Sequence, residues 1–174
     1  MVSSNKEMDI KMKFNSIAIF DLDETVIDSK HRTPNNPDGT LNLAAYMENH
    51  TPENVAKDTL LPLANTIKNL YKKGDVYIVI CTARDMKKCD YDYLDNHGIK
   101  YNMIMSRDKA SKAHYKMSDG DYKTNWLKML FNLRQFRNLP KIMWDDAKPV
   151  KTAIRKMGIP VICAHKANKY LQAA

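Results

Sequence analysis

Two pairs of acidic residues stand out because each pair directly follows an apolar run. The first run is "SIAIF" at 16–20 and the second is "KIMW" at 141–144. The pairs that follow are Asp21 with Asp23, and Asp145 with Asp146. Carboxylates brought to one place would repel one another and need a cation, and all-oxygen ligands favour Mg²⁺ over a transition metal. Such a cluster suits phosphoryl transfer, in which catalysis is mostly positioning and charge neutralisation.

Polar side chains follow two further apolar runs. The run "VYIVIC" leads into Thr82 and Arg84, and "YNMIM" leads into a segment that contains Arg107. One acid pair after a strand says little, because helix N-caps explain many of them, but polar groups after four runs point to a site. Arg84 fits either a clamp on a phosphate or backbone oxygen, or an ion pair with Asp85 or Asp145.

The same runs predict the elements that would position these residues. Five short runs lack polar alternation, as expected for parallel strands covered on both faces. They lie at 15–20, 76–81, 101–105, 141–144 and 160–164. Amphipathic helical stripes lie between them, which predicts an α/β fold with a doubly wound, Rossmann-like, five-stranded parallel sheet and helices on both faces. Ligands of such sheets bind outside the carboxyl ends of the strands, where the polar residues would lie.

One segment breaks the alternation of strands and helices. Residues 28–58 contain "HRTPNNPDGT", rich in turn formers, then a short helical piece and "TPENVAKD". In the last stretch Thr51 is a suitable N-cap and Pro52 fits the first helical position. We therefore expect one domain over 1–174, with a small cap-like insertion at 28–58 after the first strand. An insertion of this size is expected to leave the site open to a large substrate.

Composition limits the class of protein. The 174 residues carry a net charge of +8, with a pI of about 9.3, which favours anionic partners, although lysine-rich helices can serve solubility alone. Three cysteines without metal-site spacing predict reduced thiols in a cytoplasm. No apolar run approaches ~18 residues and the N-terminus lacks an apolar signal core, so no membrane association is expected. The oligomeric state is left open.

Four short motifs together resemble those of phosphatases of the haloacid dehalogenase superfamily. "DLDET" at 21–25 is similar to the first motif, and "VICT", ending at Thr82, is similar to the second. Lys123, in "SDGDYKTNWL", resembles the motif-three lysine, and "IMWDD" is similar to the fourth motif in its paired-acid form. One departure is Glu24, where many members have glycine and acid-phosphatase branches have glutamate. We expect Glu24 to point away from the acid cluster and Thr25 to secure the turn.

The resemblance implies a role for each matching residue. Asp21 would attack phosphorus to give an aspartyl-phosphate, and Asp23 would protonate the leaving group and then activate water. Thr82 and Lys123 would hold the transferred phosphoryl oxygens. Asp23, close to other negative charge, would have a raised pKa. The implied Mg²⁺ ligands are Asp21, Asp23, Asp145 and Asp146, and which of the last two binds directly is left open.

A closer resemblance is to the phosphatase domain of phage-type polynucleotide kinase/phosphatase, a family that removes 3′-phosphates from nucleic-acid ends and nucleotides. The shared features are the small insertion, Arg84 two residues after Thr82, Asp119 four residues before Lys123, and "GIPVI" after the paired acids. The chain has no glycine-rich P-loop, so the resemblance implies no kinase domain and no kinase activity.

A basic segment, "RDKASKAHYK" at 107–116, lies next to the predicted site. Its cations are Arg107, Lys109, Lys112 and Lys116. Positive charge beside the rings of His114 and Tyr115 suits a polynucleotide end, so we predict that these cations, with Arg84, bind substrate. The alternative is an ordinary solvated loop.

The leading hypothesis is a Mg²⁺-dependent phosphomonoester hydrolase that uses an aspartyl-phosphate and removes 3′-phosphates from nucleic-acid ends or nucleotides. The alternative is a phosphatase for a small metabolite such as a nucleoside monophosphate. A third possibility is a catalytically inactive domain that serves as a binding module, although every catalytic position carries a chemically suitable residue.

Overall fold

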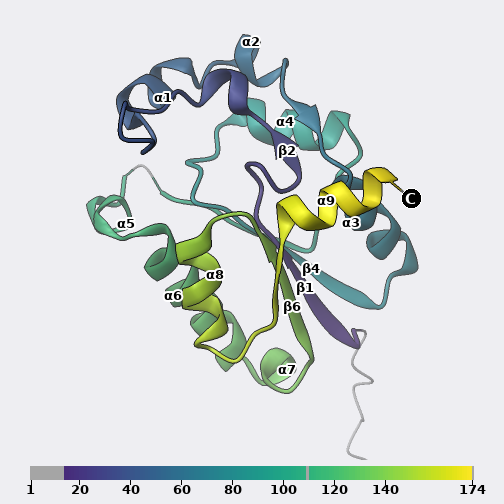
Figure 1. Ribbon diagram of the computed structural model, residues 1–174. Coiled ribbons are helices and arrows are strands. Elements are labelled where there is room, and N and C mark those ends of the chain that lie inside the picture. The colour runs from purple at the N-terminus through teal and green to yellow at the C-terminus, as the bar shows by residue number, and fades with distance from the viewer. Residues whose placement is uncertain (1–13, 109, 174) are drawn as a thin grey trace, which may run out of the picture.

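The computed structural model describes residues 14–108 and 110–173, and its centre is a parallel sheet with strand order β5-β4-β1-β6-β7 (Figure 1). The strands are β1 (Ser16–Phe20), β4 (Val76–Cys81), β5 (Met103–Met105), β6 (Lys141–Asp145) and β7 (Val161–Cys163). Every neighbouring pair is parallel. The five predicted strands and the doubly wound α/β fold are therefore confirmed.

Each face of the sheet has its own apolar core. Ala18 and Phe20 of β1 belong to one core, and Ile17 and Ile19 belong to the other, because successive strand residues point to opposite faces. The first core is covered by α3 (Leu63–Lys73), α4 (Lys88–Asn96) and α9 (Ala164–Ala173), and the second by α6 (Asp119–Asn132), α7 (Arg134–Arg137) and α8 (Lys148–Arg155). Figure 1 shows α6 and α8 on one side of the sheet and α3 and α9 on the other.

Local sequence signals account for several helix ends. Gly74 ends α3 with a left-handed φ of 79°, and its backbone N–H donates to Leu70 O at 3.2 Å. Thr51 caps α2 (Pro52–Val55), because its hydroxyl accepts the Asn54 N–H at 3.3 Å. Helices α5 (Lys112–Lys116), α7 and α9 are not predicted from the sequence, because two are short and α9 follows β7 without an intervening turn.

The insertion forms a compact unit beyond the carboxyl end of β1, at the top of Figure 1. Its elements are β2 (Ile27–Asp28), the 3₁₀ helix η1 (Lys30–Arg32), α1 (Leu43–Asn49), α2 and β3 (Thr59–Leu60). Strands β2 and β3 pair antiparallel and close the segment at its base, a feature that the sequence does not predict. Inside it the buried Arg32 guanidinium makes two 2.8 Å hydrogen bonds to the Asp58 carboxylate.

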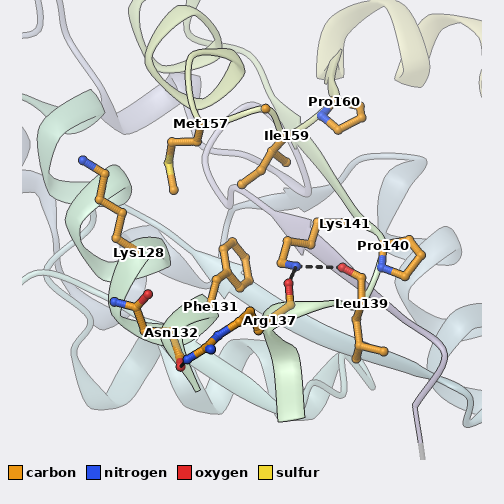
Figure 2. A pocket seen from close by; sticks show the side chains of 11 residues that line it. Lys128, Phe131, Asn132, Arg137, Leu139, Pro140, Lys141, Met157, Ile159 and Pro160 are labelled. Atoms are coloured by element: carbon orange, nitrogen blue, oxygen red, sulfur yellow. Dashed lines mark hydrogen bonds between the residues drawn. The ribbon is translucent and has the colours of Figure 1, made fainter. Parts of the chain in front are cut away.

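A pocket of about 720 Å³ lies at the opposite end of the sheet, where β6 begins and the segment before β7 passes (Figure 2). Phe131, Met157 and Ile159 contribute apolar side chains to it. The Lys141 ammonium donates to the carbonyl oxygens of Arg137 and Leu139 at 3.0 and 2.7 Å. Because the polar residues of interest follow the strands rather than precede them, this pocket is not the candidate site.

No helix within residues 14–108 and 110–173 is long and apolar enough to cross a membrane.

Candidate active site

Three of the predicted carboxylates meet at the carboxyl ends of β1 and β6. Asp21, Asp145 and Asp146 each offer an oxygen, and these oxygens lie within 4.8 Å of one another. The pairing of the two strands explains this, because Phe20 is aligned with Trp144 and the Asp21 N–H donates to Trp144 O at 3.0 Å. The register therefore places Asp21 beside Asp145 and Asp146.

Lys123 joins this group from α6. Its Nζ lies 2.6 Å from Asp21 Oδ1 and 2.8 Å from Asp145 Oδ2, and its side chain is buried. The start of α6 is fixed by Ser118, whose hydroxyl accepts the Asp121 N–H at 3.1 Å. One turn of helix then carries Lys123 onto the acids, so the position of the N-cap decides where the ammonium lies.

The group carries more negative charge than its surroundings neutralise. Burial raises the pKa of Asp21 well above its usual range, and Lys123 only partly opposes this effect. Burial and the neighbouring Asp145 also raise the pKa of Asp146. An all-oxygen donor set, buried at Asp21 and Asp145 and partly exposed at Asp146, with surplus negative charge fits a divalent cation of the Mg²⁺ type. Asp21, Asp145 and Asp146 are the residues that would hold it.

Asp23 does not join these carboxylates. Arg84 Nε donates to Asp23 Oδ2 at 3.1 Å, its NH2 group donates to Oδ1, and Ser29 Oγ donates to Oδ1 at 2.7 Å. Burial acts to raise the pKa of Asp23, but the Arg84 charge and these hydrogen bonds outweigh it and lower the pKa to about 2. The expectation of a raised pKa was therefore wrong, because the nearest charge is a guanidinium.

The turn after β1 behaves as predicted. Glu24 has a left-handed φ of 56°, a conformation that favours glycine. Its carboxylate accepts the Ser29 N–H at 3.2 Å and pairs with Lys30 at 3.0 Å, so it points away from the acid cluster. The buried Thr25 hydroxyl donates to Asp21 Oδ2 at 3.4 Å, which ties the turn to the carboxylate.

Thr82 and Arg84 follow β4 and are both buried. The Thr82 hydroxyl oxygen accepts the Arg84 N–H at 3.1 Å. Besides Asp23, the Arg84 guanidinium pairs with Asp90 at 2.6 Å and lies 3.9 Å from Asp58. It is thus held by ion pairs, but with partners other than Asp85 or Asp145. Contact between Arg84 and substrate stays a prediction.

The basic segment divides into structural and exposed residues. Arg107 NH2 donates to Met117 O at 3.0 Å and to Asp119 at 2.6 Å, and the guanidinium lies 4.8 Å from the centre of the Tyr122 ring. It therefore fastens the segment to α6. Lys112 and Lys116 are exposed on α5, whereas Lys109 lies outside the described residues.

Sequence reasoning missed a buried ionic network next to Asp23. Its additional members are Arg32, His50, Asp58 and Asp90. The sequence around His50 shows no ligand spacing and predicts a surface or packing residue. In the structure, however, its Nε2 lies 2.7 Å from Asp90 Oδ2. The residues come from segments far apart in the chain, so no spacing in the sequence could reveal them.

Solved structures with the same architecture include a protein of the Pnkp1/Rnl/Hen1 RNA repair complex, with 20% identity and a TM-score of 0.61 over 86% of this chain and 42% of that one. A haloacid dehalogenase-like hydrolase from Streptococcus pneumoniae has 15% identity and a TM-score of 0.59, covering 85% of this chain and 83% of its own. The chain thus has the fold of these haloacid dehalogenase-like hydrolases, with three carboxylates at the ends of its strands.

Sequence comparison identifies the family to which the chain belongs. A profile described as bacteriophage T5 5′-deoxynucleotidase matches residues 7–174. The 5′-deoxynucleotidase of Escherichia phage T5 is 30% identical over 171 residues, which cover 89% of this chain and 69% of that protein. The chain belongs to the bacteriophage T5 5′-deoxynucleotidase family.

Proposed function

We propose that the protein is a Mg²⁺-dependent phosphatase that hydrolyses deoxynucleoside 5′-monophosphates through an aspartyl-phosphate on Asp21. The position of Lys123, in contact with both Asp21 and Asp145, carries the chemical part of the proposal. It provides a cation where a phosphoryl group would approach Asp21. The substrate part is supported by the family and by the name of the phage T5 relative, and it corresponds to the nucleoside monophosphate alternative.

The proposed reaction begins with attack of Asp21 on phosphorus, which breaks the bond to the leaving oxygen. When bound, Mg²⁺ would neutralise charge on the transferred phosphoryl group. Lys123 would hold a phosphoryl oxygen by charge, and the Thr82 hydroxyl would hold another by hydrogen bonding. Lys123 also offsets the charge of Asp21, which a phosphate dianion would otherwise repel.

Asp23 would act as the acid and base of the two steps. Negative charge on an arriving phosphate favours the protonated carboxyl, which can donate its proton to the leaving oxygen. The resulting carboxylate can then accept a proton from the water that hydrolyses the aspartyl-phosphate. Arg84 and Ser29 hold Asp23 beside the cluster of carboxylates for this purpose.

A second candidate substrate is a 3′-phosphate at a nucleic-acid end, the leading hypothesis from the sequence. The exposed Lys112 and Lys116 of α5, on the chain segment that follows β5, favour it, because they could contact a polynucleotide backbone. In either case the segment 28–58 would serve as a small cap over one edge of the sheet.

The test is a panel of 5′- and 3′-deoxynucleoside monophosphates with matching 5′- and 3′-phosphorylated oligonucleotides, assayed with Mg²⁺ for phosphate release. The proposal expects the 5′-mononucleotides to be preferred. A preference of about sevenfold or more for a 3′-phosphorylated oligonucleotide would require only ~1.2 kcal/mol of extra contact and would select the second candidate. Asp21→Asn should abolish release on every substrate, and release that persisted would contradict the assignment of the nucleophile.

A further inference from the structure

The buried network beside the site links the insertion to Asp23. His50, at the end of α1, contacts Asp90 of α4 through Nε2 and Oδ2 at 2.7 Å. The other oxygen of Asp90 accepts from Arg84 NH1 at 2.6 Å. The remaining nitrogens of the Arg84 guanidinium donate to both oxygens of Asp23. A continuous chain of contacts therefore leads from the insertion to the proposed acid and base.

The contacts of His50 indicate what the residue is for. Its side chain is fully buried, and within the described residues its Nδ1 has no hydrogen-bond partner. The ring lies beside that of Tyr46, with 5.8 Å between the ring centres, and its Nε2 faces the Asp90 carboxylate. Because an ionised carboxylate can only accept a hydrogen bond, Nε2 carries the proton and donates it. Leaving one ring nitrogen unpaired is costly, and this makes a purely space-filling role a poor explanation.

The Asp90 carboxylate is held by several hydrogen bonds. Besides His50 and Arg84, it accepts the Lys87 N–H at 2.8 Å at the start of α4. Lys87 in turn donates from Nζ to His50 O at 2.7 Å. With its acceptor positions used in this way, Asp90 is a rigid anchor for the Arg84 guanidinium. His50, Cys89 and Asp90 lie close enough to hold a metal ion, but the contacts that Asp90 already makes argue against one.

We propose that His50 and Asp90 are positioning residues, which fix the Arg84 guanidinium so that it orients the Asp23 carboxylate for proton transfer to the leaving group. The inference rests on the proposed role of Asp23, but not on the identity of the nucleotide. It gives the insertion a function besides covering the site, because His50 is connected to the reaction centre through this network.

The test compares single-turnover release of phenol and p-nitrophenol from their phosphate esters. Phenol is the poorer leaving group and depends more on a proton from Asp23, so loss of orientation should lower the phenyl rate selectively. We expect His50→Ala and Asp90→Asn to reduce the ratio of phenyl to p-nitrophenyl rates by about tenfold or more, with little change in the Michaelis constant. His50→Gln, whose amide can still donate to Asp90, should restore most of the ratio.

The matched control is Tyr93→Phe. Tyr93 lies on α4 like Asp90, and its hydroxyl donates to Asp58 O at 2.8 Å, so its loss also weakens the contact between α4 and the insertion. This variant should lower thermal stability but leave the ratio unchanged. A folded Asp90→Asn protein with a wild-type ratio, or an equal loss on both esters, would overturn the proposal. Wild-type protein that cleaves both esters but no deoxynucleoside 5′-monophosphate would instead remove only the proposed substrate.

Discussion

The Lys123 ammonium lies 2.6 Å from Asp21 Oδ1, although the two residues are 102 positions apart in the chain. Burial disfavours charge on Lys123, but the Asp21 and Asp145 carboxylates outweigh this effect and raise its pKa above the usual range. Lys123 is therefore a fixed positive charge in contact with the Asp21 and Asp145 side chains. It stabilises the cluster and provides an electrostatic partner for an incoming phosphate.

Replacement of Lys123 by alanine should affect both stability and catalysis. We expect turnover to fall by ~10²-fold or more, as when an electrostatic stabiliser is removed from a reacting centre. Without metal, the free energy of unfolding should fall by about 3–5 kcal/mol, because buried carboxylates lose their cation. Lys128→Ala is the matched control, since Lys128 is exposed on the same helix. Near-normal turnover in Lys123→Ala would mean that another cation serves the phosphate.

Removal of the metal should be reversible and should depend on Asp146. Chelation is expected to abolish phosphate release, and added Mg²⁺ should restore it. Asp146→Asn should shift the Mg²⁺ concentration for half-maximal activity upward by about tenfold or more, because one ligand charge is lost from the group. Asp75→Asn, which changes an acid before β4 at the other end of the sheet, should not shift it. Full activity in chelator would contradict the metal assignment.

The hydroxyl of Thr82 should matter more than its methyl group. Thr82→Ala is expected to lower turnover by about tenfold or more, because a hydrogen bond to a phosphoryl oxygen is lost in the transition state. Thr82→Ser keeps the hydroxyl and should retain most of the activity. Steady-state kinetics on the preferred substrate of the panel would measure both. Equal losses in the two variants would indicate that packing at the end of β4, rather than the hydroxyl, is important.

The lysines of α5 test the nucleic-acid hypothesis directly. If Lys112 and Lys116 contact a single strand, replacing both by alanine should weaken oligonucleotide binding and reduce the slope of log affinity against log salt by about 0.7 per lost contact. Binding is measured by titration at several salt concentrations. The control is the double variant Lys72→Ala with Lys73→Ala, which removes the same charge from the last turn of α3. It should leave the slope closer to that of the wild type. An unchanged slope in the α5 variant would remove this surface from the binding site.

The sequence by itself determines the sheet and the cluster of carboxylates. Uninterrupted apolar runs predict parallel strands covered on both faces, and the carboxyl ends of such strands share one edge. The sequence therefore predicts that the acids after these runs share one edge, and the pairing of β1 with β6 brings Asp21 next to Asp145. The sequence also predicts that Glu24 points away from the cluster, as it does, whereas its left-handed φ of 56° is seen only in the structure.

Only the tertiary structure decided the surroundings of Asp23. Its partner Arg84 is 61 positions away, and Arg84 is itself held by Asp90, which His50 contacts from the insertion. Ionic contacts between distant segments leave no periodic pattern, because any buried arginine can pair with any carboxylate that the fold brings near. The same reason explains why the pKa of Asp23 is lowered rather than raised. The direction of a pKa shift depends on which charge lies closest, and the order of residues in the chain does not specify that.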